Sequence, residues 1–201
     1  MKLNIALFLL FLNLQTFAQP AEVKWLSSVY GGGSTGTDHL AKGLSASVAP
    51  LSFAIPAAIF ITGLAKKDSA LTDKGIRTSI ALAFNDIIGT GLKYYIDRSR
   101  PYAIYPDLFK AKTKTGVYSF PSSHTSFAFA TATSLALGFR KWYVSVPACL
   151  WAAGAGWSRM RLGVHYPTDV LAGALIGITS SFLTFRLDKL INRKPAANYA
   201  N

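Results

Sequence analysis

The sequence predicts an all-α fold, a helical bundle of about five to six transmembrane helices. Three observations lead to this prediction: an apolar composition, recurrent apolar segments, and basic residues in alternate loops. Hydrophobic residues make up 51% of the chain and charged residues only 15%, which is more apolar than an ordinary soluble domain. The apolar segments cover residues 48–65, 79–92, 125–139, 143–157 and 170–185.

The N-terminal stretch has the features of an export signal. One lysine precedes an apolar run, which ends in the small-x-small sequence Thr16-Phe17-Ala18, the pattern of a cleaved signal peptide. We therefore expect residues 1–18 to be a signal peptide. The alternative is an uncleaved anchor helix, because signal and anchor differ mainly in length. Residues 19–201 would form a single domain, since no linker rich in Pro, Gly or Ser divides them.

Most of the apolar segments are shorter than a typical membrane span, so buried core helices are the alternative interpretation. A soluble domain of this size needs helices with one polar face exposed to solvent, whereas residues 48–65 and 170–185 contain almost no charged side chains. With a few uncharged flanking residues, each segment reaches about 20 residues, or about 30 Å of helix, which matches a bilayer core.

Basic residues in the loops indicate an orientation. If residues 19–47 lie outside, the internal loops and the C-terminal tail contain Lys66, Lys67, Lys74, Arg77, Arg140, Lys141, Arg186, Lys189, Arg193 and Lys194. This distribution satisfies the positive-inside rule. One external stretch departs from the rule, and its basic residues are Lys93, Arg98, Arg100, Lys110, Lys112 and Lys114. Because the positive-inside rule disfavours basic residues on the external side, we expect those in this stretch to have a function there.

The net charge of +12 could indicate nucleic acid, an anionic membrane surface or an acidic substrate as partner. The cations lie in short loops, and no basic helix face is interleaved with aromatics, so we expect no nucleic-acid partner. Cys149 allows no internal disulfide and is interpreted as a small core residue. The histidines, His39, His124 and His165, lack the spacing of a metal motif, so we expect no metal and no cofactor.

The segment KYYIDRSRP, residues 93–101, holds the first candidate residues. Lys93 and Arg100 are two helical turns apart and would project from nearly the same face if the segment were helical. Pro101 disfavours a helix that continues past Arg100. The alternative is a basic cluster that binds lipid head groups beside the membrane.

The segment PSSH, residues 121–124, precedes an apolar run. Its proline and serines favour a helix start, and a simple N-cap is the structural interpretation. A helix start also presents free N–H groups and a positive dipole end, which together bind phosphate. His124 could donate a proton there. No G-x-S-x-G sequence is present, which argues against a serine hydrolase.

The segment SRMRLGVHYPTD, residues 158–169, holds Arg159, His165 and Asp169. Asp169 lies about one turn beyond His165 and could accept its Nδ1–H, which would leave Nε2 free to attack. A structural His–Asp pair is the alternative. Arg161 receives no role.

Together the three segments supply three cations, two histidines, a carboxylate and several hydroxyl or N–H donors. Arginine and lysine bind phosphate oxygens, arginine through a bidentate fork. One histidine can attack phosphorus while the other protonates the departing oxygen. This chemistry requires no metal.

The arrangement resembles the type 2 phosphatidic acid phosphatase (PAP2) family, whose signatures are K-x6-RP, PSGH and SR-x5-H-x3-D. The corresponding residues here are Lys93 through Arg100-Pro101, Pro121 through His124, and Ser158-Arg159 through His165 to Asp169. The resemblance implies a PAP2/haloperoxidase-like helical core and a membrane-type bacterial member. Ser123 stands where the family usually has glycine. A left-handed backbone would strain serine there, whereas the first turn of a helix would suit it.

The resemblance also implies a role for each site residue. His165 would be the nucleophile that forms a phosphohistidine, Asp169 would orient it, and His124 would act as general acid and later activate water. The phosphate would be held by Lys93, Arg100, Arg159, Ser122 and the backbone N–H of Ser123.

These roles predict a metal-independent membrane phosphatase that hydrolyses lipid phosphomonoesters or polyprenyl diphosphates. Its site would lie on the periplasmic or extracellular face of the bacterial inner membrane, and its partner would be a phosphorylated lipid. Catalytic groups beside apolar sequence fit this function, because the reacting phosphate would be attached to a lipid.

Three alternatives stay open. The first is a secreted soluble acid phosphatase with the same motifs. The second is a non-catalytic lipid-binding or transport protein, for which Asn85 and Asp86 would be the best support. Vanadate chloroperoxidases use a similar anion site, but as a family their chains are much longer. Lipid specificity would depend on residues 19–47 and 102–120, which show no regular pattern, and the sequence leaves the oligomeric state open.

Overall fold

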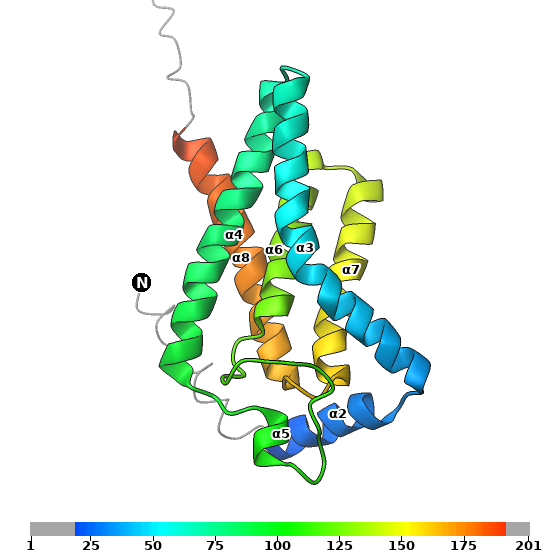
Figure 1. The fold of residues 1–201 in the computed structure, drawn as a ribbon. Coiled ribbons are helices and arrows are strands. Elements are labelled where there is room, and N and C mark those ends of the chain that lie inside the picture. Colours follow the sequence, from blue (N-terminus) through cyan, green and yellow to red (C-terminus); the bar gives the residue numbers. More distant parts are fainter. Residues whose placement is uncertain (1–18, 192–201) are drawn as a thin grey trace, which may run out of the picture.

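The computed structural model describes residues 19–191, and of Lys189 only the backbone. Within this range every regular element is a helix (Figure 1), which confirms the all-α prediction. The helices are α2 (Gln19–Gly31), α3 (Thr35–Ala65), α4 (Ser69–Ile96), α5 (Pro101–Ile104), α6 (Ser123–Phe139), α7 (Trp142–Arg161) and α8 (Pro167–Ile191). The predicted signal peptide or anchor over residues 1–18 lies outside the described residues.

Five long helices form the bundle, and each contains one of the apolar segments that the sequence predicted as helical. α6 is the central helix, because it packs against α3, α4, α7 and α8. α3 bends in its middle (Figure 1) and has Pro50 and Pro56 in its interior, where proline removes a backbone hydrogen bond and kinks a helix.

Small residues allow the central helices to approach closely. The core between α3, α6 and α7 consists of Val48 and four alanines. On α8, a Cβ atom added to Gly173 would lie 2.6 Å from the carbonyl oxygen of Ser122, and one added to Gly177 would collide with the Ser126 carbonyl. Such small-residue contacts are typical where lipid, not water, surrounds the helices. They bring the first turns of α6 and α8 together.

The outer faces of the long helices are apolar. Large side chains such as Phe53, Ile87 and Leu150 are more than half exposed. Two helical stretches, Thr35–Ala65 and Pro167–Asp188, are long and apolar enough to cross a membrane. Exposed apolar surface of this extent suits lipid better than water, and we describe the chain as a membrane protein. Cys149 is exposed, so its interpretation as a core residue is wrong: an apolar residue on α7 can face outward.

Residues 19–47, for which the sequence showed no regular pattern, are mostly helical. They form α2 and the first turns of α3. α2 packs against α7 and α8 and buries both Glu22 and Leu26. Because a charged residue shares the buried face with a leucine, the helix lacks the clean apolar stripe by which sequence patterns identify one. α2, α5 and the segment after α5 lie at one end of the bundle (Figure 1).

Candidate active site

A cleft of about 690 Å³ opens at this end of the bundle. It lies where the last turns of α4 and α7 meet the first turn of α6 and the loop before α8. Its lining includes six of the predicted site residues, namely Lys93, Arg100, Ser123, His124, Arg159 and His165, and it is completed by Tyr94 and residues 114–118. Side chains separated by up to 72 positions along the sequence, from Lys93 to His165, therefore share one cleft.

His165 lines the cleft and faces Asp169, which lies behind it. His165 lies in the loop before α8 and Asp169 in the first turn of that helix, and both are almost fully buried. The Nδ1 atom of His165 lies 3.4 Å from Oδ2 of Asp169, longer than a charge-assisted hydrogen bond of about 2.7–2.9 Å. NH1 of Arg100 lies 3.2 Å from Nε2 of the same ring. Because a guanidinium only donates, Nε2 accepts, and the ring proton of neutral His165 sits on Nδ1, facing Asp169.

The electrostatics of the site keep His165 neutral. Burial lowers the pKa of His165 to about 3, the positive charges of Arg100 and Arg159 act in the same direction, and the carboxylate of Asp169 opposes them. At neutral pH the imidazole is therefore uncharged, and Nε2 has an unprotonated lone pair that accepts from Arg100 and can act as a nucleophile once that hydrogen bond is released.

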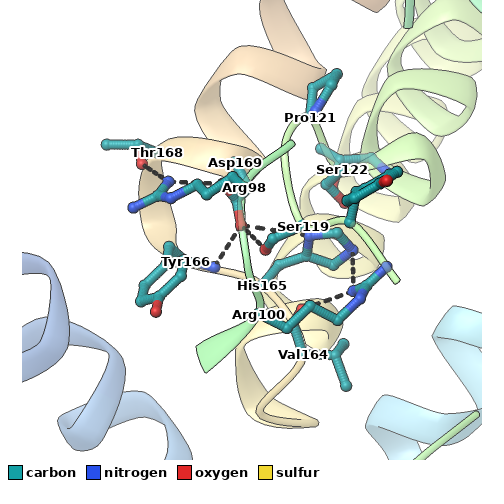
Figure 2. Close-up of polar contacts among 12 residues, drawn as sticks. Arg98, Arg100, Ser119, Pro121, Ser122, Val164, His165, Tyr166, Thr168 and Asp169 are labelled. Atoms are coloured by element: carbon teal, nitrogen blue, oxygen red, sulfur yellow. Dashed lines mark hydrogen bonds and ion pairs between the residues drawn. The ribbon is translucent and has the colours of Figure 1, made fainter. Parts of the chain in front are cut away.

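Three donors fix the carboxylate of Asp169 (Figure 2). NH1 of Arg98 donates to Oδ1 at 2.7 Å, and the backbone N–H of Tyr166 donates to Oδ2 at 2.8 Å. The hydroxyl of Ser119 also donates to Oδ2. Neither residue belongs to the predicted site, because Arg98 lies at a position that the first motif leaves unspecified and Ser119 lies outside the three motifs. Only the placement of Arg98 among the external cations could have drawn attention to it.

Lys93 and Arg100 lie on either side of the end of α4, and both line the cleft. α4 ends at Ile96, followed by Asp97 in a left-handed conformation (φ 48°), and Pro101 opens the next helix. The two cations therefore do not share a helix face, and the helical arrangement considered for this segment does not occur. The end of α4 at the left-handed Asp97, not helical spacing, brings both to the cleft.

Backbone carbonyls hold the cations in place. Nζ of Lys93 donates to the carbonyl of Pro121 at 3.0 Å. Nε of Arg100 donates to the carbonyl of Gly116 at 2.6 Å, and its NH1 donates to that of Val164 at 2.7 Å. These neutral acceptors orient the side chains without neutralising their charge, which stays available for an anion.

Arg159 projects from the last turn of α7 and is buried. NH1 of Arg159 donates to the hydroxyl of Ser45 at 2.5 Å, while its Nε has no hydrogen-bond partner among the described residues. A buried, unpartnered guanidinium N–H beside a cleft suits an anionic ligand. Within residues 19–191, no group of three or more His, Cys, Asp or Glu side chains is arranged to hold a metal ion.

The PSSH segment forms the start of α6. Ser122 is the N-cap, accepts a hydrogen bond from the backbone N–H of Thr125, and is fully buried. Its hydroxyl is thus engaged within the helix turn, and its contact with phosphate stays a prediction. Ser123 is the first helical residue and lies outside the left-handed region, so serine replaces the family's usual glycine without backbone strain. Ser123 and His124 line the cleft.

Arg161, which received no role from the sequence, braces the N-terminal helices. Its Nε lies 2.7 Å from Oδ1 of Asp38, and its NH1 donates to the carbonyls of Val29 and Tyr30. Lys112 pairs with the same carboxylate at 2.9 Å. This network joins α2, α3 and α7 beside the cleft.

The fold and site define a class of protein: a helical membrane bundle in which buried cations, two histidines and a carboxylate converge at one end. The chain belongs to the PAP2 superfamily, whose family model matches residues 75–193. The matched range contains all eight predicted site residues.

Curated relatives and a solved structure agree with this assignment. An undecaprenyl-diphosphatase from Sulfolobus acidocaldarius is 31% identical over 114 residues, which cover 57% of this chain and 55% of the relative. The chain thus matches about half the length of that relative. Phosphatidylglycerophosphatase B from Bacillus subtilis is 30% identical over 178 residues, 84% of this chain and 78% of the relative. The crystal structure of a transmembrane PAP2-type phosphatidylglycerolphosphate phosphatase from the same organism superposes with a TM-score of 0.74 at 26% identity, covering 96% of this chain and 99% of the other.

Proposed function

We propose that the protein is a membrane phosphatase that hydrolyses a lipid phosphomonoester or a polyprenyl diphosphate through a phosphohistidine intermediate on His165. One observation carries this proposal: a neutral, buried His165 lines a cleft together with Lys93, Arg100 and Arg159, with its Nε2 toward Arg100 and its Nδ1 toward Asp169. Three cations can hold the oxygens of one phosphoryl group while the imidazole attacks its phosphorus.

In the first step, Nε2 of His165 bonds to phosphorus as the bond to the leaving oxygen breaks. Burial and the positive charges of Arg159, Arg100 and Lys93 lower the pKa of His124 to about 4. The negative charge of a bound phosphate offsets these cations and favours uptake of a proton by His124, which then donates it to the leaving oxygen. The hydrogen bond from Arg100 to Nε2 is exchanged for one to a phosphate oxygen, which frees the lone pair. The imidazole becomes positively charged, and the carboxylate of Asp169 stabilises the charge through Nδ1–H. The N–H groups at the start of α6, including that of Ser123, contribute further donors to the phosphate.

In the second step, His124 removes a proton from water, and the resulting hydroxide attacks the phosphohistidine. The phosphorus–nitrogen bond breaks, phosphate leaves, and both histidines return to their starting protonation states. In this scheme side chains perform every proton transfer, and side chains together with backbone N–H groups stabilise the charge, so it needs no metal ion.

The surroundings of the cleft support a lipid substrate. Tyr94 and Val117 line the cleft and are 70% and 78% exposed, and apolar helix faces begin beside them. A head group can enter the cleft while its acyl or prenyl chain stays in the bilayer. The exposed apolar surface argues against the soluble acid phosphatase. Asn85 and Asp86, the best support for a transport protein, lie outside the cleft lining.

We further propose that the site faces the periplasm or the exterior and that the protein lies in the bacterial inner membrane. The loops at the other end of the bundle, between α3 and α4 and between α6 and α7, contain Lys66, Lys67, Arg140 and Lys141 (Figure 1). Short loops rich in lysine and arginine stay in the cytoplasm.

Phosphate release by purified protein tests the function. The substrates would be phosphatidate, phosphatidylglycerophosphate, undecaprenyl diphosphate and lipid A. We expect release from at least one of them, resistance to EDTA and inhibition by vanadate. His165→Ala should lower kcat by about 10³-fold or more, as removal of a covalent nucleophile does. His39→Ala is the matched control, because His39 is exposed on α3 and outside the cleft lining. Wild-type protein inert on all four lipids, or an active His165→Ala variant, would contradict the proposal.

A further inference from the structure

Arg98 lies between two carboxylates that come from opposite ends of the chain. Its NH2 lies 2.6 Å from Oε2 of Glu22 on α2, and its NH1 lies 2.7 Å from Oδ1 of Asp169 on α8. The side chains are 11%, 6% and 0% exposed for Arg98, Glu22 and Asp169, respectively. The guanidinium also lies over the ring of Tyr166, 4.1 Å from its centroid. Arg98 does not line the cleft, so it acts on the site through Asp169.

Glu22 contacts the same helix start from its other side. Its Oε1 accepts a hydrogen bond from the backbone N–H of Thr168 at 3.2 Å and another from the hydroxyl of that residue. Thr168 is in the first turn of α8, next to Asp169, and its hydroxyl also accepts from NH1 of Arg98 at 2.8 Å. Glu22 thus caps the helix start whose next residue is Asp169. A negative charge at a helix N-terminus is favourable.

The charge of Arg98 is secure in this position. Burial opposes its charge, but the carboxylates of Asp169 and Glu22 outweigh burial and raise the pKa of Arg98. The guanidinium therefore stays charged and supplies Asp169 with a permanent counter-ion. Without it, a fully buried carboxylate would be left with only the Ser119 hydroxyl, a backbone N–H and the His165 ring, and a buried carboxylate without a cation tends to take up a proton.

We propose that Arg98 and Glu22 are positioning residues, which hold the carboxylate of Asp169 against Nδ1 of His165 and make α2 part of the active-site framework. The inference rests on the proposed function only for its kinetic readout. A purely structural tie between α2 and the bundle would have the same contacts, and the experiment must therefore separate positioning from stability.

The principal variant is Arg98→Gln, which removes the charge while keeping a polar side chain. We expect kcat to fall about 10- to 100-fold, the loss typical when a group that orients a metal-binding histidine is removed. KM should change less than about threefold, because Arg98 does not contact the phosphate. The acid limb of the pH profile of kcat/KM should move to higher pH, since Asp169 holds its proton more tightly without the cation.

Glu22→Gln provides a milder variant that keeps the size of the side chain. It should change kcat in the same direction by a smaller factor, because Arg98 can still donate to the amide oxygen. It also keeps the inference testable if Arg98→Gln fails to fold. Arg98→Lys should restore part of kcat, since a lysine retains the charge but cannot bridge both carboxylates.

Arg161→Gln is the matched control. Arg161 is also a buried arginine that pairs with a carboxylate from an N-terminal helix, but within residues 19–191 its partners are Asp38, Val29 and Tyr30, not Asp169. We expect it to lower the thermal stability in detergent while leaving the pH profile of kcat/KM in place. If Arg98→Gln keeps the wild-type kcat and pH profile, or if Arg161→Gln shifts the profile equally, the positioning role is wrong.

A second readout does not depend on activity. The ¹⁵N NMR signals of the His165 ring, assigned by their loss in His165→Asn, report which nitrogen carries the proton. Because Arg100 still donates to Nε2 in Arg98→Gln, we expect the Nδ1–H form in both proteins, but the ¹H resonance of Nδ1–H should move in Arg98→Gln, since its neighbour Asp169 loses the ion pair that holds the carboxylate in place. An unchanged Nδ1–H resonance would overturn the inference. If the wild type releases no phosphate from any lipid, the proposed function fails, and this measurement still decides the role of Arg98.

Discussion

At the scale of single residues, the low pKa of His165 links the nucleophile to stability. His165 stays neutral in the folded protein down to a pKa of about 3, whereas an unfolded chain would protonate it near pH 6.5. Below pH 6.5 the unfolded state therefore binds a proton that the folded state does not. The free energy of unfolding therefore keeps its full value with respect to this group above pH 6.5. It decreases as the pH falls from 6.5 toward 3, by up to about 1.4 kcal/mol per pH unit.

We predict that the thermal unfolding midpoint of the wild type in detergent falls more steeply between pH 6.5 and 4 than that of His165→Gln, whose side chain does not titrate. The difference between the two slopes isolates His165 from other titrating groups. His39→Gln, which alters an exposed histidine, should keep the wild-type slope. Equal slopes for the wild type and His165→Gln would show that His165 is not held neutral.

At the scale of elements, the close packing of α8 on α6 aligns the two helix starts that carry Asp169 and His124. This packing depends on Gly177, because a Cβ atom there would lie 2.7 Å from the backbone nitrogen of Ala130 and still closer to the carbonyl oxygen of Ser126. Backbone atoms in the middle of a helix cannot move aside without shifting the helix.

We predict that Gly177→Ala costs about 1–3 kcal/mol of stability, the usual range for overpacking, and lowers kcat because it displaces the first turn of α8. Gly91→Ala is the control: a Cβ atom at Gly91 meets nothing within 4 Å, and alanine favours the helix. Thermal unfolding and kcat, measured on both variants in the same detergent, check the expectation. A Gly177→Ala protein as stable and active as Gly91→Ala would mean that the helices adjust without moving the site.

At the scale of the whole molecule, the sequence predicted the five long helices and six of the residues that line the cleft, for identifiable reasons. Runs such as residues 170–185 are apolar on all sides, and motif spacing marks Lys93, His124 and His165 directly. Glu22, Arg98 and Ser119 were not predicted, because each acts through a contact between distant segments. In the sequence, Glu22 cannot be told apart from a solvent-exposed charge, because its partner Arg98 lies far away along the chain.

The distribution of charge between the two ends of the bundle leads to the last prediction. At the cleft end, backbone carbonyls and carboxylates accept hydrogen bonds from the cations. These cations would be kept at this end because they bind the substrate phosphate or support the site. At the other end, the cations of the α3–α4 and α6–α7 loops include Lys66, Lys67 and Arg140, which are exposed and would set the proposed orientation.

We predict that a cysteine at Val117, beside the cleft, reacts with a membrane-impermeant maleimide in intact bacterial cells with a permeabilised outer membrane. A cysteine at Ser69, in the first turn of α4, should react only after lysis. Both would be made in a Cys149→Ser background, and neither change removes a basic residue. Total labelling after lysis controls for reactivity. The reverse pattern would place the cleft in the cytoplasm, where it would meet lipid phosphates of the inner leaflet, and would show that the cations at the cleft, not the loop lysines, determine the topology.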